Sequence, residues 1–348
     1  MKNLTGKLAV SAFLSASILL THSSYAKTDN QQSIASPAIA SNQVAGFYRQ
    51  ALGDFQITAL YDGDAKLPLE QYFQGQSTEK MSALLKGYYI DPSKAIQTSV
   101  NAFLINTGKE LILVDSGAAK CFGEGLGSIE KNLNAAGYHV EQVDKILLTH
   151  LHPDHVCGIS PIAGQKAFPN ATVYVDQTEA DFWLNPTNLS KFPKEKQANF
   201  KSVFDQTAKI IQPYQASKQF KTFKVGDQIA EGINIVPTHG HTIGHSSFLV
   251  NSKNQKMLIL GDVVHSHALQ FEQPEISFTA DFDAKQAIQT RLALFKTFAK
   301  NGDFIAAAHL PFPGVGHIRE TSPNHYQWIP VQYNPQVLPV DQVNKTVK

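Results

Sequence analysis

Residues 145–158, KILLTHLHPDHVCG, decide the fold. An apolar run of strand type opens this stretch and passes directly into HLHPDH at residues 150–155. Histidines at positions i and i+2 after a strand can converge on one cation, and Asp154 and His155, one turn later, can serve a second. Four ionisable side chains within six positions have no packing rationale, because burial without a cation would leave polar groups unpaired at a cost of kcal/mol each. The stretch therefore predicts metal binding at a strand end.

Later strands also end in residues that can ligate a metal. The strand predicted over 233–237 leads into HGHTIGH (239–245), and the two strands that follow end near Asp262 and His309. Scaffolds of the α/β type usually build sites from side chains at strand ends on one rim of a sheet. We therefore expect these residues to join 150–155. Asp262 is suited to bridge two cations because each of its oxygens can bind one.

Strand and helix patterns fill residues 46–333, which we expect to form one domain because no linker or repeat interrupts them. The early strands follow one another as a meander, with a hairpin turn at residues 106–109, and the later strands alternate with helices. That order favours an α/β protein with helices outside mixed sheets. The predicted strands cover 56–61, 102–105, 111–115, 145–149, 172–175, 233–237, 247–250, 256–260 and 304–308, and the predicted helices cover 125–136, 177–184, 194–212 and 283–300.

The composition excludes several classes of protein. The chain has 348 residues with 30 Lys+Arg against 29 Asp+Glu, so its formal net charge of +1 gives no general attraction to nucleic acid. Two Cys cannot form a disulfide scaffold or a zinc site made of Cys alone. A near-neutral chain favours a small neutral substrate, and no nucleic-acid partner is expected.

The first 26 residues have the pattern of a secretory signal peptide. Lys2 and Lys7 precede an apolar and small-residue run at 8–20, and Ser24-Tyr25-Ala26 forms a small-x-small cleavage site. The run is too short and too rich in Ser to span a bilayer, and no other segment is a candidate span. We expect cleavage after Ala26 and a periplasmic or secreted protein. The expected domains are a signal peptide (1–26), a flexible lead-in (27–45), a domain that carries the predicted metal ligands (46–333) and a C-terminal tail (334–348).

The motifs HxHxDH, GHTxGH, LGD and AxH, in this order, resemble the metallo-β-lactamase superfamily of hydrolases. The resemblance is closer to the methyl parathion hydrolase branch and its lactonase relatives. It implies a four-layer αβ/βα sandwich, the metallo-β-lactamase fold, with two metals on the rim between two sheets. The resemblance runs through residues 101–119, 135–158, 167–184, 239–245 and 306–319.

The resemblance also implies a ligand set and two divalent metal ions per chain. Zinc is the default, and manganese, iron, cobalt or cadmium can occupy such sites. Asp115 and His245 match positions next to the ligands, where a side chain supports a ligand without binding the metal itself. By the resemblance, the first metal is held by His150, His152 and His241, the second by Asp154, His155 and His309, and Asp262 bridges the two.

The expected chemistry is hydrolysis of an ester-like bond by a hydroxide that bridges the metals. Asp262 and His265 are the predicted catalytic residues. The methyl parathion enzyme has an apolar Leu where His265 stands, and some homoserine-lactone hydrolases have a Tyr three residues after the bridging Asp. A His can donate a hydrogen bond or proton to a lactone or carboxyl ester. We therefore expect a lactonase or aryl-esterase, with acyl-homoserine lactones among its substrates.

Other functions stay open at this stage. One is an organophosphate triester hydrolase of the methyl parathion type, and another, of a different class, is a mononuclear-iron oxygenase of sulfur compounds, which shares HxHxDH. Phe122, Trp183 and Phe200 match aromatic pocket positions of the organophosphate-hydrolysing relatives, although ordinary core packing would equally explain them. The related enzymes also suggest a homodimer.

The two cysteines, Cys121 and Cys157, depart from the family pattern together. In an oxidising compartment they could form a disulfide, and two separate free thiols are the alternative.

Overall fold

The computed structural model describes residues 39–41, 43–162 and 164–335. The predicted signal peptide, most of the lead-in and most of the C-terminal tail lie outside the described residues. The chain divides into two compact units, Met1–Gln43 and Val44–Lys348, and the second contains all the elements described below. Within the described part of the chain, no helix is long and apolar enough to cross a membrane.

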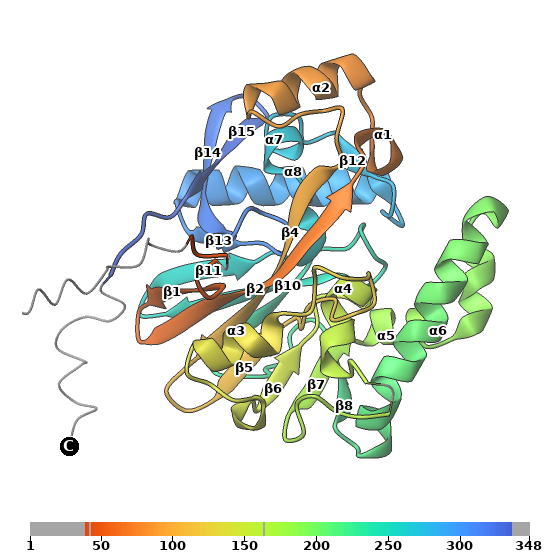
Figure 1. Ribbon diagram of the computed structural model, residues 1–348, viewed down its shortest axis with the longest axis vertical. Helices are drawn as coiled ribbons and strands as arrows, with labels where there is room; N and C mark the ends of the chain where they lie inside the picture. Colours follow the sequence, from red (N-terminus) through yellow and green to blue (C-terminus); the bar gives the residue numbers. More distant parts are fainter. Residues whose placement is uncertain (1–38, 42, 163, 336–348) are drawn as a thin grey trace, which may run out of the picture. The chain divides into compact units, whose positions relative to one another are not determined.

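Two mixed β-sheets form the centre of the second unit (Figure 1). In the seven-stranded sheet, of order β1-β2-β4-β5-β6-β7-β8, the strands β5 to β8 are parallel. In the six-stranded sheet, of order β15-β14-β13-β11-β10-β9, β11 and β13 are parallel neighbours. The strands are β1 (Phe47–Leu52), β2 (Phe55–Leu67), β4 (Ile96–Asn106), β5 (Leu111–Val114), β6 (Lys145–Leu147), β7 (Thr172–Asp176), β8 (Phe220–Phe223), β9 (Ile233–Pro237), β10 (Ser246–Ser252), β11 (Gln255–Ile259), β13 (Phe304–Ala306), β14 (Val315–Ser322) and β15 (His325–Pro330), and a separate pair of β3 (Phe73–Gln74) with β12 (Ser277–Phe278).

Helices cover the outer face of each sheet. Apolar residues of α3, α5 and α6 pack with the seven-stranded sheet, and those of α8 pack with the six-stranded sheet (Figure 1). The shorter helices α1, α2 and α7 share an apolar cluster with the β3–β12 pair. The helices are α1 (Leu69–Tyr72), α2 (Thr78–Gly87), α3 (Ile129–Ala135), α4 (Pro153–Val156), α5 (Gln177–Trp183), α6 (Lys194–Ala216), α7 (His267–Gln270) and α8 (Ala284–Asn301).

Alternation of side chains along the strands builds these layers. In β5, Leu111 and Leu113 pack with the helices on the outer face, whereas Ile112 and Val114 pack with residues of the second sheet. Burial on both faces is typical of a parallel strand and explains its continuous apolar sequence. The order helix, sheet, sheet, helix confirms the predicted αβ/βα sandwich.

Local sequence signals place several element ends correctly. The turn at 106–109 joins β4 to β5, with Gly108 at φ +79°. Asp283 caps α8 by accepting a hydrogen bond from the Gln286 amide at 3.0 Å, and Gly302, at φ +71°, ends that helix.

Other predicted bounds are wrong. The helix predicted over 125–136 begins only at Ile129, because Gly125 and Gly127 have φ values of +101° and +95°, outside the helical region. The helix predicted over 194–212 continues to Ala216, since Pro213 near its end removes only one backbone hydrogen bond. The strand predicted over 56–61 extends to Leu67.

Candidate metal centre

The motif at 150–155 turns from a strand into a short helix. β6 ends at Leu147, and His150 follows in the buried connection. His152 has extended backbone angles (φ −71°, ψ 149°), and Pro153 then begins α4. A proline fits the first helical position because its φ is already helical and no backbone partner is lost there. Asp154 and His155 therefore project from the first turn of α4, beside the two histidines that precede it.

Two groups of ligand atoms lie side by side and share one carboxylate. Within each group the potential ligand atoms lie within 4.8 Å of one another. Asp262 belongs to both groups. The first group is His150, His152, His241 and Asp262, and the second is Asp154, His155, Asp262 and His309.

The carboxylate of Asp262 lies between the two groups, and His309 Nε2 reaches both of its oxygens, at 3.1 Å from Oδ1 and 3.2 Å from Oδ2. Its Oδ1 lies 3.1 Å from Nε2 of His155 and 3.1 Å from Nε2 of His309. Its Oδ2 lies 3.3 Å from Nε2 of His241 and 3.7 Å from Nε2 of His150. This is the arrangement that a carboxylate needs in order to bridge two cations.

The buried donor set fits two cations. His155 Nε2 and Asp262 Oδ1 are close, but their orientation does not make a hydrogen bond. Among the described residues, His150 Nε2, His155 Nε2 and Asp262 Oδ1 have no hydrogen-bond partner, and all three side chains are almost fully buried. Burial lowers the pKa of His152 to about 3, and the neutral imidazole is the form that binds a metal. Burial opposes ionisation of Asp262, but the neighbouring His155 and His309 hold its pKa well below the usual range. Orphaned nitrogens around an ionised carboxylate are costly unless a metal occupies the gap.

A comparison with family models identifies the fold family. Residues 95–309 match the model described as Metallo-beta-lactamase superfamily, a span from the start of β4 to the last ligand, His309. The chain belongs to the metallo-β-lactamase superfamily. The match contains every residue of both ligand groups, as the resemblance in the motifs predicted.

Solved members of the superfamily share the fold along most of the chain. The hydrolase AbOPH of the beta lactamase superfamily is 52% identical, with a TM-score of 0.82, over 84% of this chain and 100% of that one. AidC, a dizinc quorum-quenching lactonase solved with its product, is 26% identical, with a TM-score of 0.75 and the same coverage.

Curated relatives are more distant. The N-acyl homoserine lactonase of Bacillus thuringiensis is 23% identical over 239 residues, which are 63% of this chain and 84% of the relative. The probable metallo-hydrolases of Mycobacterium bovis and Mycobacterium tuberculosis are 24% identical over 185 residues, or 47% of this chain. The chain spans only 56% of the length of those two relatives.

Each ligand group contains a histidine that is oriented by a carboxylate. Asp115 accepts a hydrogen bond from Nδ1 of His155 at 2.9 Å, so Nε2 faces the metal gap. Asp115 sits at φ +58° just after β5, and its Oδ1 also accepts the Thr149 amide at 2.8 Å. Asp281 binds Nδ1 of His241 at 2.8 Å in the same way. Such pairs fix the tautomer and ring orientation of a ligand histidine.

His245 lies behind the bridging carboxylate. Its Nε2 accepts a hydrogen bond from the Asp262 amide at 3.0 Å, so its Nδ1 carries the proton and donates to Thr238 Oγ1 at 2.7 Å. Both ring nitrogens are therefore occupied, and His245 acts as a support for Asp262. A Cβ atom on Gly261 would lie 2.7 Å from His245 Nε2, and Gly261 has φ +58°. Both constraints explain the glycine before Asp262.

His265 lies inside the centre. Its side chain is 2% exposed, and its Nε2 lies 3.2 Å from Asp262 Oδ2. The ring stacks on Phe278, with centroids 3.9 Å apart and an interplanar angle of 10°, and lies parallel to His309 at 5.2 Å. Burial lowers the pKa of His265 to about 4. His267, two residues later, is half-buried and packs edge-on against Tyr88 at 5.2 Å.

The three aromatic pocket candidates have different surroundings. Trp183 is 2% exposed and contacts the His152 ring edge-on at 5.3 Å, so it borders the first ligand group. Phe200 packs behind it at 6.0 Å, and stacks on Phe192 at 3.9 Å. Phe122 is 56% exposed and makes no ring contact with Trp183 or Phe200. The structure thus brings two of the three together, largely as a packed aromatic cluster.

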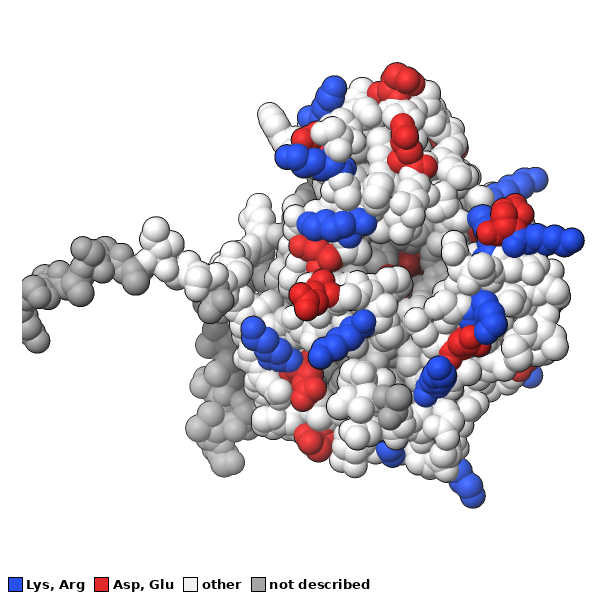
Figure 2. All heavy atoms as spheres, turned by 45° about the vertical axis from the view of Figure 1, so that its right-hand side comes forward, with Lys and Arg blue, Asp and Glu red and all other residues white. Residues whose placement is uncertain are grey.

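The surface and the loops around the centre add two observations. Figure 2 shows a hollow in one face of the molecule, with acidic and basic side chains mixed around it rather than gathered by sign.

Cys121 and Cys157 form a disulfide, with their Cα atoms 6.4 Å apart, which joins the loop after β5 to the end of α4. This decides between the two alternatives that the sequence left open.

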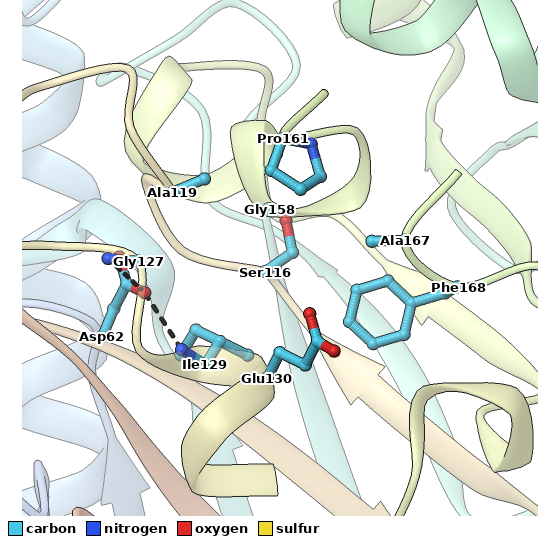
Figure 3. Close-up of a pocket in the computed structure, with 10 residues that line it drawn as sticks. All are labelled: Asp62, Ser116, Ala119, Gly127, Ile129, Glu130, Gly158, Pro161, Ala167 and Phe168. Atoms are coloured by element: carbon cyan, nitrogen blue, oxygen red, sulfur yellow. Dashed lines mark hydrogen bonds between the residues drawn. The ribbon is translucent and has the colours of Figure 1, made fainter. Parts of the chain in front are cut away.

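A separate small pocket lies behind the loop after β5 (Figure 3). Its volume is about 50 Å³, and Ser116, Glu130, Gly158 and Phe168 are among its lining residues. Asp62 at its edge accepts hydrogen bonds from backbone amides, including that of Gly127 at 3.0 Å. No residue of either ligand group lines it, and it is too small for a substrate.

Two buried carboxylates that contact the ligand histidines or their loops, Asp281 and Glu179, have no signal in the sequence. Asp281 is 40 positions from the His241 that it orients, and Glu179 lies in α5, distant in sequence from the loops that it contacts. Both residues lie near the start of a predicted helix. Acidic residues are common at that position, so neither position suggested a role at the centre.

Proposed function

We propose that the chain is a dimetal hydrolase of ester-like bonds that acts on lactones or aryl esters, acyl-homoserine lactones included. The observation that carries the proposal is the position of His265, buried beside Asp262 Oδ2 at 3.2 Å. A polar ring there can serve the oxygen of a lactone or ester, which an apolar side chain could not. The description of AidC, at 26% identity, as a dizinc lactonase solved with its homoserine product supports this substrate class.

The residues of the chain divide the chemical tasks among them. Both ligand groups would hold divalent cations, zinc by default, and these supply an acidified water and Lewis-acid polarisation of the scissile bond. Asp115 and Asp281 keep the ligand tautomers fixed. The carboxylate of Asp262 can only accept, so the proton of His265 is on Nε2. From there the N–H group can donate a hydrogen bond to the oxygen that gains negative charge during ring opening.

An organophosphate triester hydrolase is the second candidate. Trp183 at the edge of His152 supports it, because an aromatic wall beside the first ligand group would accept an aryl leaving group. A mononuclear-iron oxygenase is a weaker candidate. Such an enzyme needs one metal, whereas Asp154, His155 and His309 form a complete second group.

A hydrolysis panel on the purified holoenzyme tests the proposal. The panel contains acyl-homoserine lactones, dihydrocoumarin, aryl acetates and methyl paraoxon, with metal content and oxygen uptake measured in parallel. We expect the lactones or aryl acetates to have the highest kcat/KM. A higher kcat/KM for methyl paraoxon would favour the second candidate, and one iron per chain with oxygen uptake would favour the oxygenase.

We also propose that the protein is exported to the periplasm or beyond. The n-region, apolar run and cleavage pattern of residues 1–26 support this, as does the Cys121–Cys157 disulfide, because disulfides persist mainly in oxidising compartments. N-terminal sequencing of the protein from a periplasmic fraction should find a chain that begins at Lys27. Recovery of the intact N-terminus from the cytoplasm would contradict export.

A further inference from the structure

A buried carboxylate joins the two loops that carry the histidines of the first ligand group. Glu179 of α5 has no exposed surface. Its Oε1 accepts a hydrogen bond from the Leu151 amide at 3.0 Å, and its Oε2 accepts one from the Gly244 amide at 2.9 Å. Leu151 lies between the ligands His150 and His152, and Gly244 lies three residues after the ligand His241. One side chain therefore spans both loops.

The surrounding elements hold this side chain and its partners in place. Asp176 caps α5 and accepts the Glu179 amide at 3.3 Å, which fixes the start of the helix. The carbonyl of Leu151 accepts a hydrogen bond from Thr207 Oγ1 of α6 at 3.1 Å. The peptide groups around Leu151 are thus anchored by α5 on one side and by α6 on the other. Burial raises the pKa of Glu179 to about 7, so the fold keeps a carboxylate there at an energetic cost.

The second glycine of HGHTIGH is explained by the same contact. A Cβ atom on Gly244 would lie 2.4 Å from the Glu179 amide nitrogen and 2.7 Å from Asp176 Oδ1. Gly244 is not among the glycines with positive φ, so close approach to α5, and not backbone conformation, requires a glycine at this position. The loop must therefore lie directly against the first turn of α5, where the carboxylate reaches it.

We propose that Glu179 is a positioning residue that sets the spacing between the two loops of the first metal site. The affinity of that site then depends on Glu179, whereas the second site depends on Asp115, which orients His155. The inference rests on the metal centre of the proposed hydrolase and not on its substrate. If the hydrolysis panel finds no lactone or ester substrate, the inference about Glu179 still stands. The test of that inference measures metal binding.

Glu179→Gln tests the proposal. Glutamine has one acceptor oxygen, so its NH₂ group must face one of the two backbone amides, and that loop is pushed away. Zinc retained per chain is measured against rising chelator concentration, and anomalous scattering from crystals with one zinc per chain shows which site stays filled. We expect first-site affinity to fall by about 10–100-fold and second-site affinity to stay within about twofold.

Asp62→Asn is the matched control. Asp62 is also a buried carboxylate that accepts hydrogen bonds from several backbone amides, among them those of Gly127 and Ile129 (Figure 3) and that of Ala118 at 2.8 Å. None of these amides belongs to a loop of the first site. The control should lower thermal stability without changing first-site affinity. Equal affinity loss at both sites in Glu179→Gln, no loss at either, or the same first-site loss in Asp62→Asn would overturn the proposal.

Two further measurements keep the test decisive if Glu179→Gln does not fold. Gly244→Ala places a methyl group against the first turn of α5 and so separates Gly244 from Glu179. It should also weaken the first site selectively. In the metal-free wild-type protein, the amides of Leu151 and Gly244 should exchange hydrogen as slowly as those of the central strands. Fast exchange at either amide would show that the Glu179 side chain does not hold the loops, and the proposal would fail.

Discussion

Asp281→Asn should weaken metal binding at the first ligand group. Asp281 accepts two hydrogen bonds, from Nδ1 of His241 at 2.8 Å and from the Phe278 amide at 3.0 Å. An asparagine has one acceptor oxygen for these two donors. If its oxygen stays on the backbone amide, its NH₂ group faces Nδ1 of His241. The proton then moves to Nε2, and the ligand lone pair is lost.

The size of the effect follows from the role of such carboxylates. Removing the partner of a ligand histidine typically costs 10–100-fold in metal affinity, which is about 1.4–2.7 kcal/mol. Asp281 is almost fully buried, so water cannot readily replace the lost acceptor. We therefore expect the upper half of that range. The second group, whose His155 is oriented by Asp115, should keep its affinity.

Chelator competition on the purified protein measures the effect, with zinc retained per chain as the readout. Asp283→Asn, two residues away, is the control. Asp283 caps α8 through the Gln286 amide, and asparagine caps helices as well as aspartate does. The control should behave like the wild type. Wild-type affinity at both sites in Asp281→Asn would refute the idea that this carboxylate fixes the His241 tautomer.

Three further predictions concern catalysis and stability. His265→Leu should lower lactone kcat/KM more than aryl phosphotriester kcat/KM, and equal losses on both substrates would contradict the role of His265 as a hydrogen-bond donor to the substrate oxygen. Arg291→Met should lower the free energy of unfolding in urea by about 3 kcal/mol, because the buried guanidinium donates to three backbone carbonyls, and only that of Ile276 keeps a second donor, Gln270. A loss below about 1 kcal/mol would contradict this. Replacing Cys121 and Cys157 by Ser should lower stability by about 2–4 kcal/mol, since the bond closes a loop with a sequence separation of 36. Reduction of the wild type should reproduce that loss, and unchanged stability after complete reduction would show that the cross-link does not constrain the unfolded chain.

The sequence predicted the parts of the centre whose signals are local. Within HLHPDH the ligands are neighbours in the chain, and the later ligands each follow an apolar strand directly. Parallel strands bring such ends to one rim, so the convergence could be expected before the structure was known. The position of Asp262 between the two groups follows the same logic.

Long-range supports could not be predicted in this way. Asp281 and Glu179 reach their partners only because the segment at 278–283 and helix α5 fold back onto the ligand loops. No spacing along the chain marks such contacts. The last two strands were also missed: β14 and the edge strand β15 are half-exposed and rich in polar residues, so their apolar alternation is weak. In β2, the irregularity between Tyr61 and Gly63 interrupts the period of two and hides the second half of the strand.

Anomalous diffraction from crystals of the metal-loaded protein tests the central claim most directly. We predict two peaks per chain. One should lie among His150, His152 and His241, the other among Asp154, His155 and His309, with Asp262 between them. A single peak, or two peaks that do not share Asp262, would contradict the dimetal centre on which the proposed hydrolase rests.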